Sequence, residues 1–133
     1  MTITGMHGYV LGFLLIGSWA VICVWALILR FAASEETPVF WRAVSVAQIL
    51  LALQLIVGLV LLVMGRRPGG EAASGRALAF HIAYGVVFPI ITLVVGHKMA
   101  RDGKYRPHAV FAVVGLVLFG LTARAWMVGQ GGA

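Results

Sequence analysis

The chain has 133 residues, of which 62% are hydrophobic and 11% are charged, and its formal net charge is +6. A soluble domain carries about 25% charged residues, so this composition excludes an ordinary water-soluble domain and indicates an integral membrane protein. The basic residues lie between the apolar runs, which favours topology setting and anionic lipid headgroups over nucleic acid as the reason for the positive charge. The single cysteine, Cys23, excludes an internal disulfide and a CxxC redox pair.

Four apolar runs each supply the roughly 20 residues that a helix needs to cross the hydrocarbon core. They cover about residues 6–31, 39–64, 77–99 and 107–128, so we expect a single domain over residues 1–133. The first run is too long for a signal-peptide core and lacks its basic region and cleavage site, which predicts a retained span. Continuous apolar runs favour helices over barrel strands, and short connections make neighbours antiparallel. We therefore predict an all-α, integral membrane, up-down-up-down four-helix bundle.

Lysine and arginine are distributed unevenly between the two ends of this bundle. One end carries Arg30, Arg42, Lys98, Arg101, Lys104 and Arg106, and the other carries Arg66, Arg67, Arg76 and Arg124. The positive-inside rule makes the first end cytoplasmic and places both termini outside. We expect a multi-pass protein of the bacterial inner membrane.

The third run opens with the segment 77–88, which places His81 about one turn inside the membrane. An ionisable side chain at that depth is costly, so it is a functional-site candidate by default. Several residues of the other runs are expected at the same depth: His7, Gly8 and Gly12 from the first, Gln54 and Gly58 from the second, and Gly120 and Arg124 from the fourth.

Two histidines on alternate helices at one membrane end can serve as the axial ligands of a haem iron. His7 and His81 are the predicted metal ligands. Glycines near the ligands would let a porphyrin edge approach the backbone, and the candidates are Gly12, Gly58, Gly85 and Gly120. Arg76 and Arg124 lie at the end where the propionates would point, and arginine pairs well with carboxylates. The sequence thus predicts one haem b.

The same residues also have a purely structural interpretation. His81 can be a core histidine bonded to a backbone carbonyl or to Gln54, and His7 can lie at the membrane interface. Glycines pack membrane helices together, and Arg124 can extend to the headgroups. Under this alternative the chain is a cofactor-free accessory subunit of a larger membrane oxidoreductase complex.

A second haem near His97 and His108 is not expected. Sixteen residues separate His81 from His97, and at 100° per residue they make four turns plus about 160°. If His81 faces the bundle interior, His97 therefore faces away from it. Both His97 and His108 also have basic neighbours, as interfacial residues do.

Three further features bear on packing and function. Gln48 and Gln54 are expected to form hydrogen bonds between helices, and Pro89 is expected to kink the third helix just past Gly85. Every aspartate and glutamate lies in a connection, and no hydrolase, kinase, zinc or nucleotide motif is present. An electron carrier or subunit is therefore favoured over an independent enzyme.

The histidine arrangement resembles the small bacterial four-helix b-type cytochromes and one half of haem A synthase. His7 with Gly8-Tyr9, and His81 with Tyr84-Gly85, carry this resemblance. The chain lacks the carboxylate beside a ligand histidine, so the resemblance implies haem binding and electron transfer rather than haem modification. It also implies a small subunit in the lipid bilayer beside a larger respiratory or photosynthetic redox complex, or a quinone. The sequence leaves open whether the bundle works alone or as a homodimer.

Overall fold

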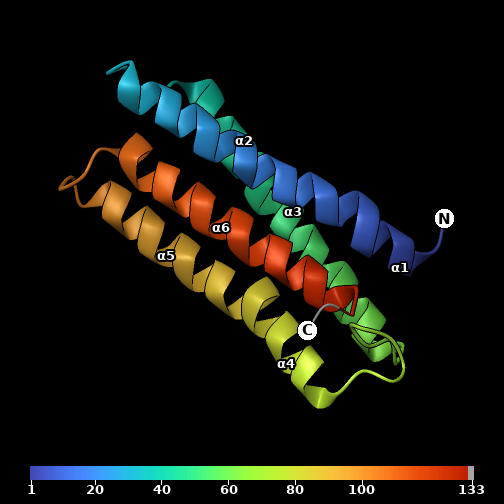
Figure 1. The fold of residues 1–133 in the computed structure, drawn as a ribbon. Coiled ribbons are helices and arrows are strands. Elements are labelled where there is room, and N and C mark those ends of the chain that lie inside the picture. The colour runs from blue at the N-terminus through green and yellow to red at the C-terminus, as the bar shows by residue number, and fades with distance from the viewer. Residues whose placement is uncertain (132–133) are drawn as a thin grey trace.

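The computed structural model describes residues 1–131 and consists of four helical rods joined by short connections (Figure 1). The first rod contains α1 (Ile3–Gly5), the π-helical segment η1 (Met6–Leu11) and α2 (Gly12–Phe31). The second is α3 (Pro38–Val63). The third contains α4 (Gly75–Ile82), the π-helical segment η2 (Ala83–Val87) and α5 (Phe88–Arg101), and the fourth is α6 (Pro107–Gly129).

Each rod is long and apolar enough to cross a membrane. The four candidate spans are Ile3–Phe31, Pro38–Val63, Gly75–Arg101 and Pro107–Gly129. Their ends lie close to the predicted ones; the largest difference is that the first span begins at Ile3 rather than at residue 6. The predicted all-α four-helix bundle is confirmed, and the chain is a multi-pass membrane protein.

Local sequence signals explain where the helices begin. The Thr37 hydroxyl accepts a hydrogen bond from the Phe40 backbone N–H at 3.5 Å, and Pro38 occupies the first helical position, where its missing N–H costs nothing. The Ser74 hydroxyl caps α4 in the same way through the Ala77 N–H at 3.4 Å. Pro107 opens α6.

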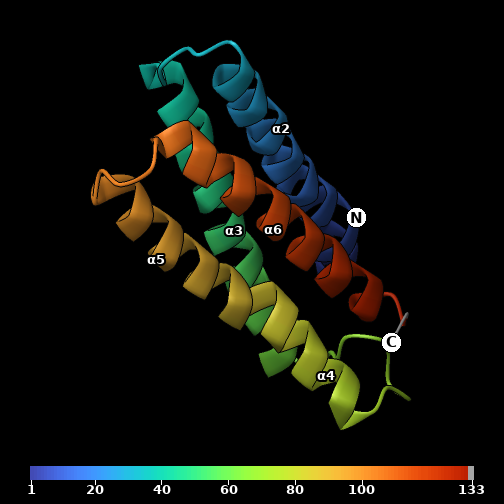
Figure 2. The ribbon, with the colours of Figure 1, turned by 60° about the vertical axis from the view of Figure 1, so that its left-hand side comes forward.

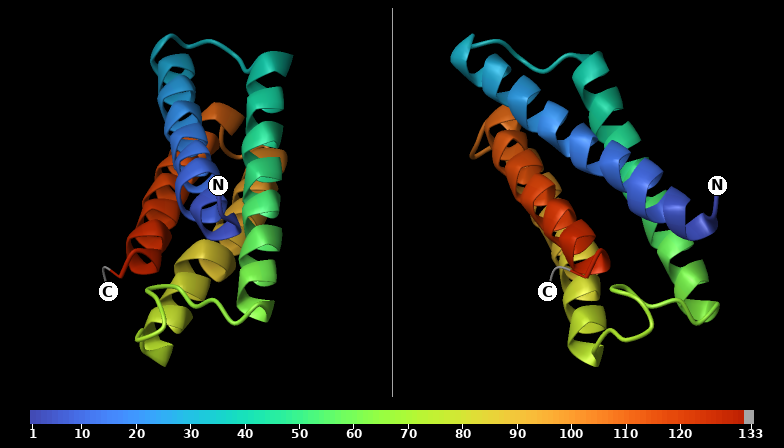
Figure 3. Two further views of the ribbon diagram at one scale, coloured as in Figure 1. Left: turned by 90° about the vertical axis from the view of Figure 1, so that its right-hand side faces the viewer. Right: turned by 45° about the vertical axis from the view of Figure 1, so that its right-hand side comes forward.

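The rods pack as two antiparallel hairpins, α2 with α3 and α5 with α6 (Figure 2). The most extensive packing joins the hairpins through α2 and α6. A Cβ added to Gly115 would lie 2.8 Å from the backbone nitrogen of Cys23, so glycine is required for this close approach. Figure 3 shows the connection 64–74 crossing from α3 to α4 at the end of the bundle that holds both termini.

Aromatic and polar contacts join the helices at the opposite end of the bundle, beside a second pocket of about 320 Å³ that Trp41, His97 and Arg101 help to line. Phe40 and Phe111 are fully buried there, and the Trp41 ring packs edge-on against both of them at 5.2 Å. The Gln48 amide of α3 donates to His97 Nε2 of α5 at 2.7 Å. The His108 backbone N–H donates to the Glu36 carboxylate, whose oxygen also lies 3.0 Å from His108 Nδ1.

One expectation about this end was wrong. His97 does not face away from the bundle, because its ring contacts Gln48 and lies 5.2 Å from the Phe111 ring. The π-helical segment η2 lies between His81 and His97, and its wide turn accommodates one extra residue. Each residue turns the helix by about 100°, so the extra residue reduces the expected angle between His81 and His97 around the helix axis from 160° to about 60°. His108 lies in the first turn of α6 and is buried, with 2% of its surface exposed.

A kink just past Gly85 was predicted from Pro89, and the structure has the π-helical segment η2, which includes Gly85 and ends two residues before Pro89. Proline has no N–H to donate to the carbonyl four residues earlier, and its ring crowds that carbonyl. The α-helical pattern therefore gives way to a π-helical one immediately before α5, in which Pro89 is buried. The interhelical hydrogen bonds predicted for Gln48 and Gln54 are both confirmed.

Candidate functional site

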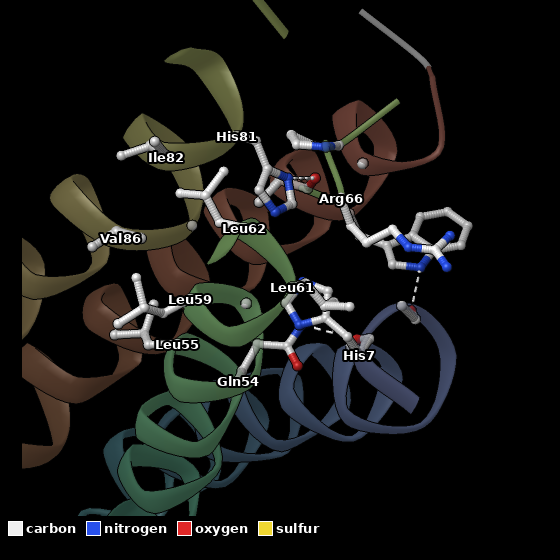
Figure 4. Close-up of a pocket in the computed structure, with 18 of the residues that line it drawn as sticks. His7, Gln54, Leu55, Leu59, Leu61, Leu62, Arg66, His81, Ile82 and Val86 are labelled. Atoms are coloured by element: carbon white, nitrogen blue, oxygen red, sulfur yellow. Dashed lines mark hydrogen bonds between the residues drawn. The ribbon is translucent and has the colours of Figure 1, made fainter. Parts of the chain in front are cut away.

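A cavity of about 440 Å³ lies between the rods at the end that holds both termini (Figure 4). Residues of all four rods and of the connection 64–74 line it. The structure brings five of the predicted site residues to its wall: His7, Gly12, Gly58, His81 and Gly85.

The imidazoles of His7 and His81 face each other across this cavity. Their ring centroids are 6.1 Å apart, and the ring planes are inclined by 56°. Two imidazole–metal bonds of about 2.0 Å, with about 1.1 Å from each nitrogen to its ring centre, would place the centroids of two opposed ligands about 6 Å apart. The two side chains therefore have the separation that a metal held between them requires.

His81 is held by one ring nitrogen and leaves the other available. Its Nδ1 lies 2.9 Å from the backbone carbonyl of Ala125. A carbonyl only accepts hydrogen bonds, so Nδ1 carries the proton and, in the neutral ring, Nε2 carries the lone pair. Figure 4 shows this second nitrogen of His81 directed toward the side of the cavity where His7 lies. The contact to a carbonyl expected of a core histidine is present, and it is also the contact that orients a histidine ligand.

His7 is positioned through its own backbone, which belongs to η1. The carbonyl of His7 accepts a hydrogen bond from the Gln54 amide of α3 at 2.9 Å. The adjacent carbonyl of Gly8 accepts one from the Trp126 indole of α6 at 2.7 Å. Donors from two other helices thus fix the segment that carries the His7 ring.

Two buried polar atoms of the site lack a hydrogen-bond partner among residues 1–131. They are His7 Nδ1 and Gln54 Oε1. Such atoms are rare in native proteins, because an unsatisfied buried group costs about 1–3 kcal/mol. Their presence beside the cavity indicates a place where a bound group or an ion would complete the bonding.

Glycines provide the space for both imidazoles. A Cβ on Gly58 would lie 3.1 Å from His7 Cε1, and a Cβ on Gly129 would lie 3.2 Å from His81 Cε1. A Cβ on Gly12 would meet the Trp126 ring at 3.2 Å. Gly129 was missed because it lies just beyond the fourth run, where nothing in the sequence relates it to His81.

The remaining predicted residues lie elsewhere. Gly120 is exposed, nothing lies within 4 Å of a Cβ added there, and it is not part of the cavity wall. Arg76 is exposed, with its guanidinium carbon 5.9 Å from the centre of the Phe80 ring. Arg124 is half-buried and does not line the cavity.

The arginines at the cavity are Arg66 and Arg67, from the connection 64–74. In the sequence they contribute only to the predicted orientation of the bundle in the membrane. They are distant from both histidines along the chain, and only the path of the connection brings them to the cavity.

Both histidines adjoin a π-helical segment. His7 lies within η1, and His81 lies two residues before η2 begins. Such wide turns are uncommon and occur frequently at functional sites. Within residues 1–131, no group of three or more His, Cys, Asp or Glu side chains could hold a metal ion. Two imidazoles suit a metal whose other donor atoms belong to a cofactor.

No protein family, no curated protein and no solved structure matches this chain. The fold and the site define a four-span helical membrane protein with a two-histidine cavity at one end of the bundle.

Proposed function

We propose that this protein is a membrane haem b-binding electron-transfer protein in which His7 and His81 are the axial ligands. The observation that carries the proposal is the pair of facing imidazoles, 6.1 Å apart in a cavity lined by all four rods. Haem would supply the other nitrogen donors to its iron, so His7 and His81 are the two residues that would hold it.

The residues around the ligands have defined roles in this proposal. The Ala125 carbonyl keeps the proton of His81 on Nδ1, which orients the ring and increases the basicity of Nε2. Gln54 and Trp126 hold η1 through the carbonyls of His7 and Gly8. When bound, haem takes up and releases single electrons, and burial and axial ligation tune its potential.

The redox partner is proposed to be a quinone in the bilayer or a larger membrane redox complex. Aliphatic side chains of α3 and of α4–η2 line the side of the cavity away from the histidines: Leu55, Leu59, Ile82 and Val86 (Figure 4). The chain would be a small multi-pass protein of a bacterial inner membrane, with this end of the bundle facing outward.

The test is a dithionite-reduced minus air-oxidised absorption spectrum of the protein purified in detergent from a haem-replete host. We expect the sharp α band of low-spin haem with two histidine ligands. His7→Ala and His81→Ala should each abolish that band, whereas His97→Ala, at the far end of the bundle, should retain it.

Two outcomes would contradict the proposal. Full low-spin haem occupancy in both His7→Ala and His81→Ala would refute the assigned ligands. A flat difference spectrum, from protein that is folded and made with ample haem, would refute haem binding and support a cofactor-free accessory subunit.

A further inference from the structure

Two arginines stand at the rim of an otherwise largely apolar cavity. Arg66 and Arg67 line it beside Pro68, and none of its lining residues is acidic. Figure 4 shows Arg66 on the side of the cavity that also holds His7 and His81, opposite Ile82 and Val86. One side of the cavity is therefore cationic and polar, and the other is aliphatic.

The backbone holds these arginines in place at both ends of a short turn. The Arg66 N–H donates to the Leu61 carbonyl at 2.9 Å, which closes the end of α3. Gly65 has φ +77°, a left-handed conformation that glycine adopts without strain. Three residues after Arg66, the Gly69 N–H donates to the Gly129 carbonyl at the end of α6, at 3.0 Å. The arginine pair is thus tied to two helices of the cavity wall.

We propose that Arg66 and Arg67 bind the carboxylates of an amphipathic ligand whose apolar body occupies the cavity. This inference rests on the proposed function, under which the carboxylates are the two haem propionates. A guanidinium presents paired N–H groups that match a carboxylate, and such charge-assisted bonds are stronger than neutral ones. The assignment replaces Arg76 and Arg124, neither of which lines the cavity.

The arginines lie where the chain leaves the end of α3, so their charge stays near the membrane surface. A ligand that is anionic at one end and apolar at the other can then enter the cavity in one orientation only. Anionic lipid headgroups share the chemistry of a propionate, so the experiment must distinguish the two sources of negative charge.

The experiment titrates the haem-free full-length protein in non-ionic detergent with haem and with haem dimethyl ester, whose propionates are neutral. The wild-type protein should bind haem about tenfold or more tightly than the ester, since each charge-assisted contact contributes substantially to affinity. The Arg66→Gln/Arg67→Gln variant should lose this preference and still bind the ester as the wild type does. The Arg66→Lys/Arg67→Lys variant should retain part of the preference, and the matched control Arg76→Gln should retain all of it.

The outcomes separate the two proposals. If the wild-type protein binds neither haem nor the ester, the proposed function fails. If both bind with a low-spin spectrum and the double glutamine variant keeps the wild-type preference, only the arginine assignment fails. The same titration in phosphatidylcholine and phosphatidylglycerol vesicles tests the lipid source. In one outcome, the double glutamine variant keeps the wild-type preference for haem over the ester, while phosphatidylglycerol changes the haem affinity of the wild type and not that of the variant. That result would assign the arginines to lipid and overturn this inference.

Discussion

At the scale of single residues, the two histidines differ in how their ring nitrogens are used. His81 donates from Nδ1 to a carbonyl of α6, so its orientation is fixed before any ligand is present. His7 has a buried Nδ1 with no partner among residues 1–131, and its position depends on the backbone of η1. Under the proposed function, the His81 ring is therefore already oriented to bind iron, and we expect the His7 ring to adjust more when haem binds.

Glycine substitutions beside the rings test this arrangement. Gly58→Ala and Gly129→Ala would each place a methyl group within 3.2 Å of an imidazole carbon, so the ring must shift. Overpacking costs about 1–3 kcal/mol, and we expect haem affinity to fall about five- to tenfold or more. Haem titration followed by absorbance measures the effect.

Gly17→Ala is the matched control for these variants, because nothing lies within 4 Å of a Cβ added at Gly17. It should leave haem affinity unchanged. If Gly58→Ala and Gly129→Ala bind haem like Gly17→Ala, the two imidazoles are not confined by their glycine neighbours.

At the scale of the helical elements, the two π-helical segments decide which side chains face inward. Without η2, His81 and His97 would point to nearly opposite sides of one helix. With it, His81 faces the cavity and His97 reaches Gln48 on α3. Pro89 accounts for η2. No proline lies near η1 in the sequence, and there the side chains of Gln54 (α3) and Trp126 (α6) donate hydrogen bonds to the carbonyls of His7 and Gly8.

The close contact between α2 and α6 can be tested by adding a methyl group at Gly115. In Gly115→Ala, the new methyl group would meet backbone atoms of Cys23 at 2.8–3.0 Å, which a side-chain rotation cannot relieve. The two helices must separate, and we expect a loss of stability of about 1–3 kcal/mol or more. Thermal unfolding in detergent, followed by circular dichroism, should show a lower Tm.

Gly120→Ala, on the same helix, provides the comparison. Nothing lies within 4 Å of a Cβ added there, and alanine has the higher helix propensity. Its Tm should equal or slightly exceed that of the wild type. An equal Tm for Gly115→Ala would mean that the helices tolerate a wider separation than the packing implies.

At the scale of the whole molecule, the two ends of the bundle are packed with side chains of different size. Bulky rings such as Phe40 and Phe111 pack at the end opposite the termini, together with the contacts Gln48–His97 and Glu36–His108. At the other end glycines replace bulky side chains, and the connection 64–74 passes over the end of α6. The cavity that holds the two histidines lies at the end with fewer bulky side chains, and a second pocket of about 320 Å³, lined by Trp41, His97, Ala100, Arg101 and Pro107, lies at the other end.

The orientation of the bundle in the membrane is tested with single cysteines. In a Cys23→Ala background, Ala72→Cys lies in the connection beside the cavity and Lys104→Cys in the connection at the opposite end of the bundle. The excess of basic residues at the Lys104 end predicts that this end is cytoplasmic. A membrane-impermeant maleimide should therefore label Ala72→Cys in intact bacterial cells and label Lys104→Cys only after lysis. The reverse pattern would place the cavity on the cytoplasmic side.

Sequence alone determined the features that depend on local physics. A bilayer of fixed thickness demands about 20 apolar residues per span, and its lack of water demands a helix, so the four spans and their antiparallel order follow from composition along the chain. The cost of an imidazole in lipid singled out His81, and the shared depth added His7 and several glycines. All of these are properties of a residue and its near neighbours.

Only the tertiary structure decided how these pieces face one another. One extra residue in η2 rotates everything beyond it by about 100°, so the inward turn of His97 could not be counted from ideal helices. Arg66 and Arg67 reach the cavity because the connection 64–74 folds back onto the end of α6, where the Gly69 N–H donates to the Gly129 carbonyl. Gly129 reaches His81 because α4 packs against α6. Hydropathy places a residue at a depth in the membrane, but the angle around the helix and the course of a connection are set by packing.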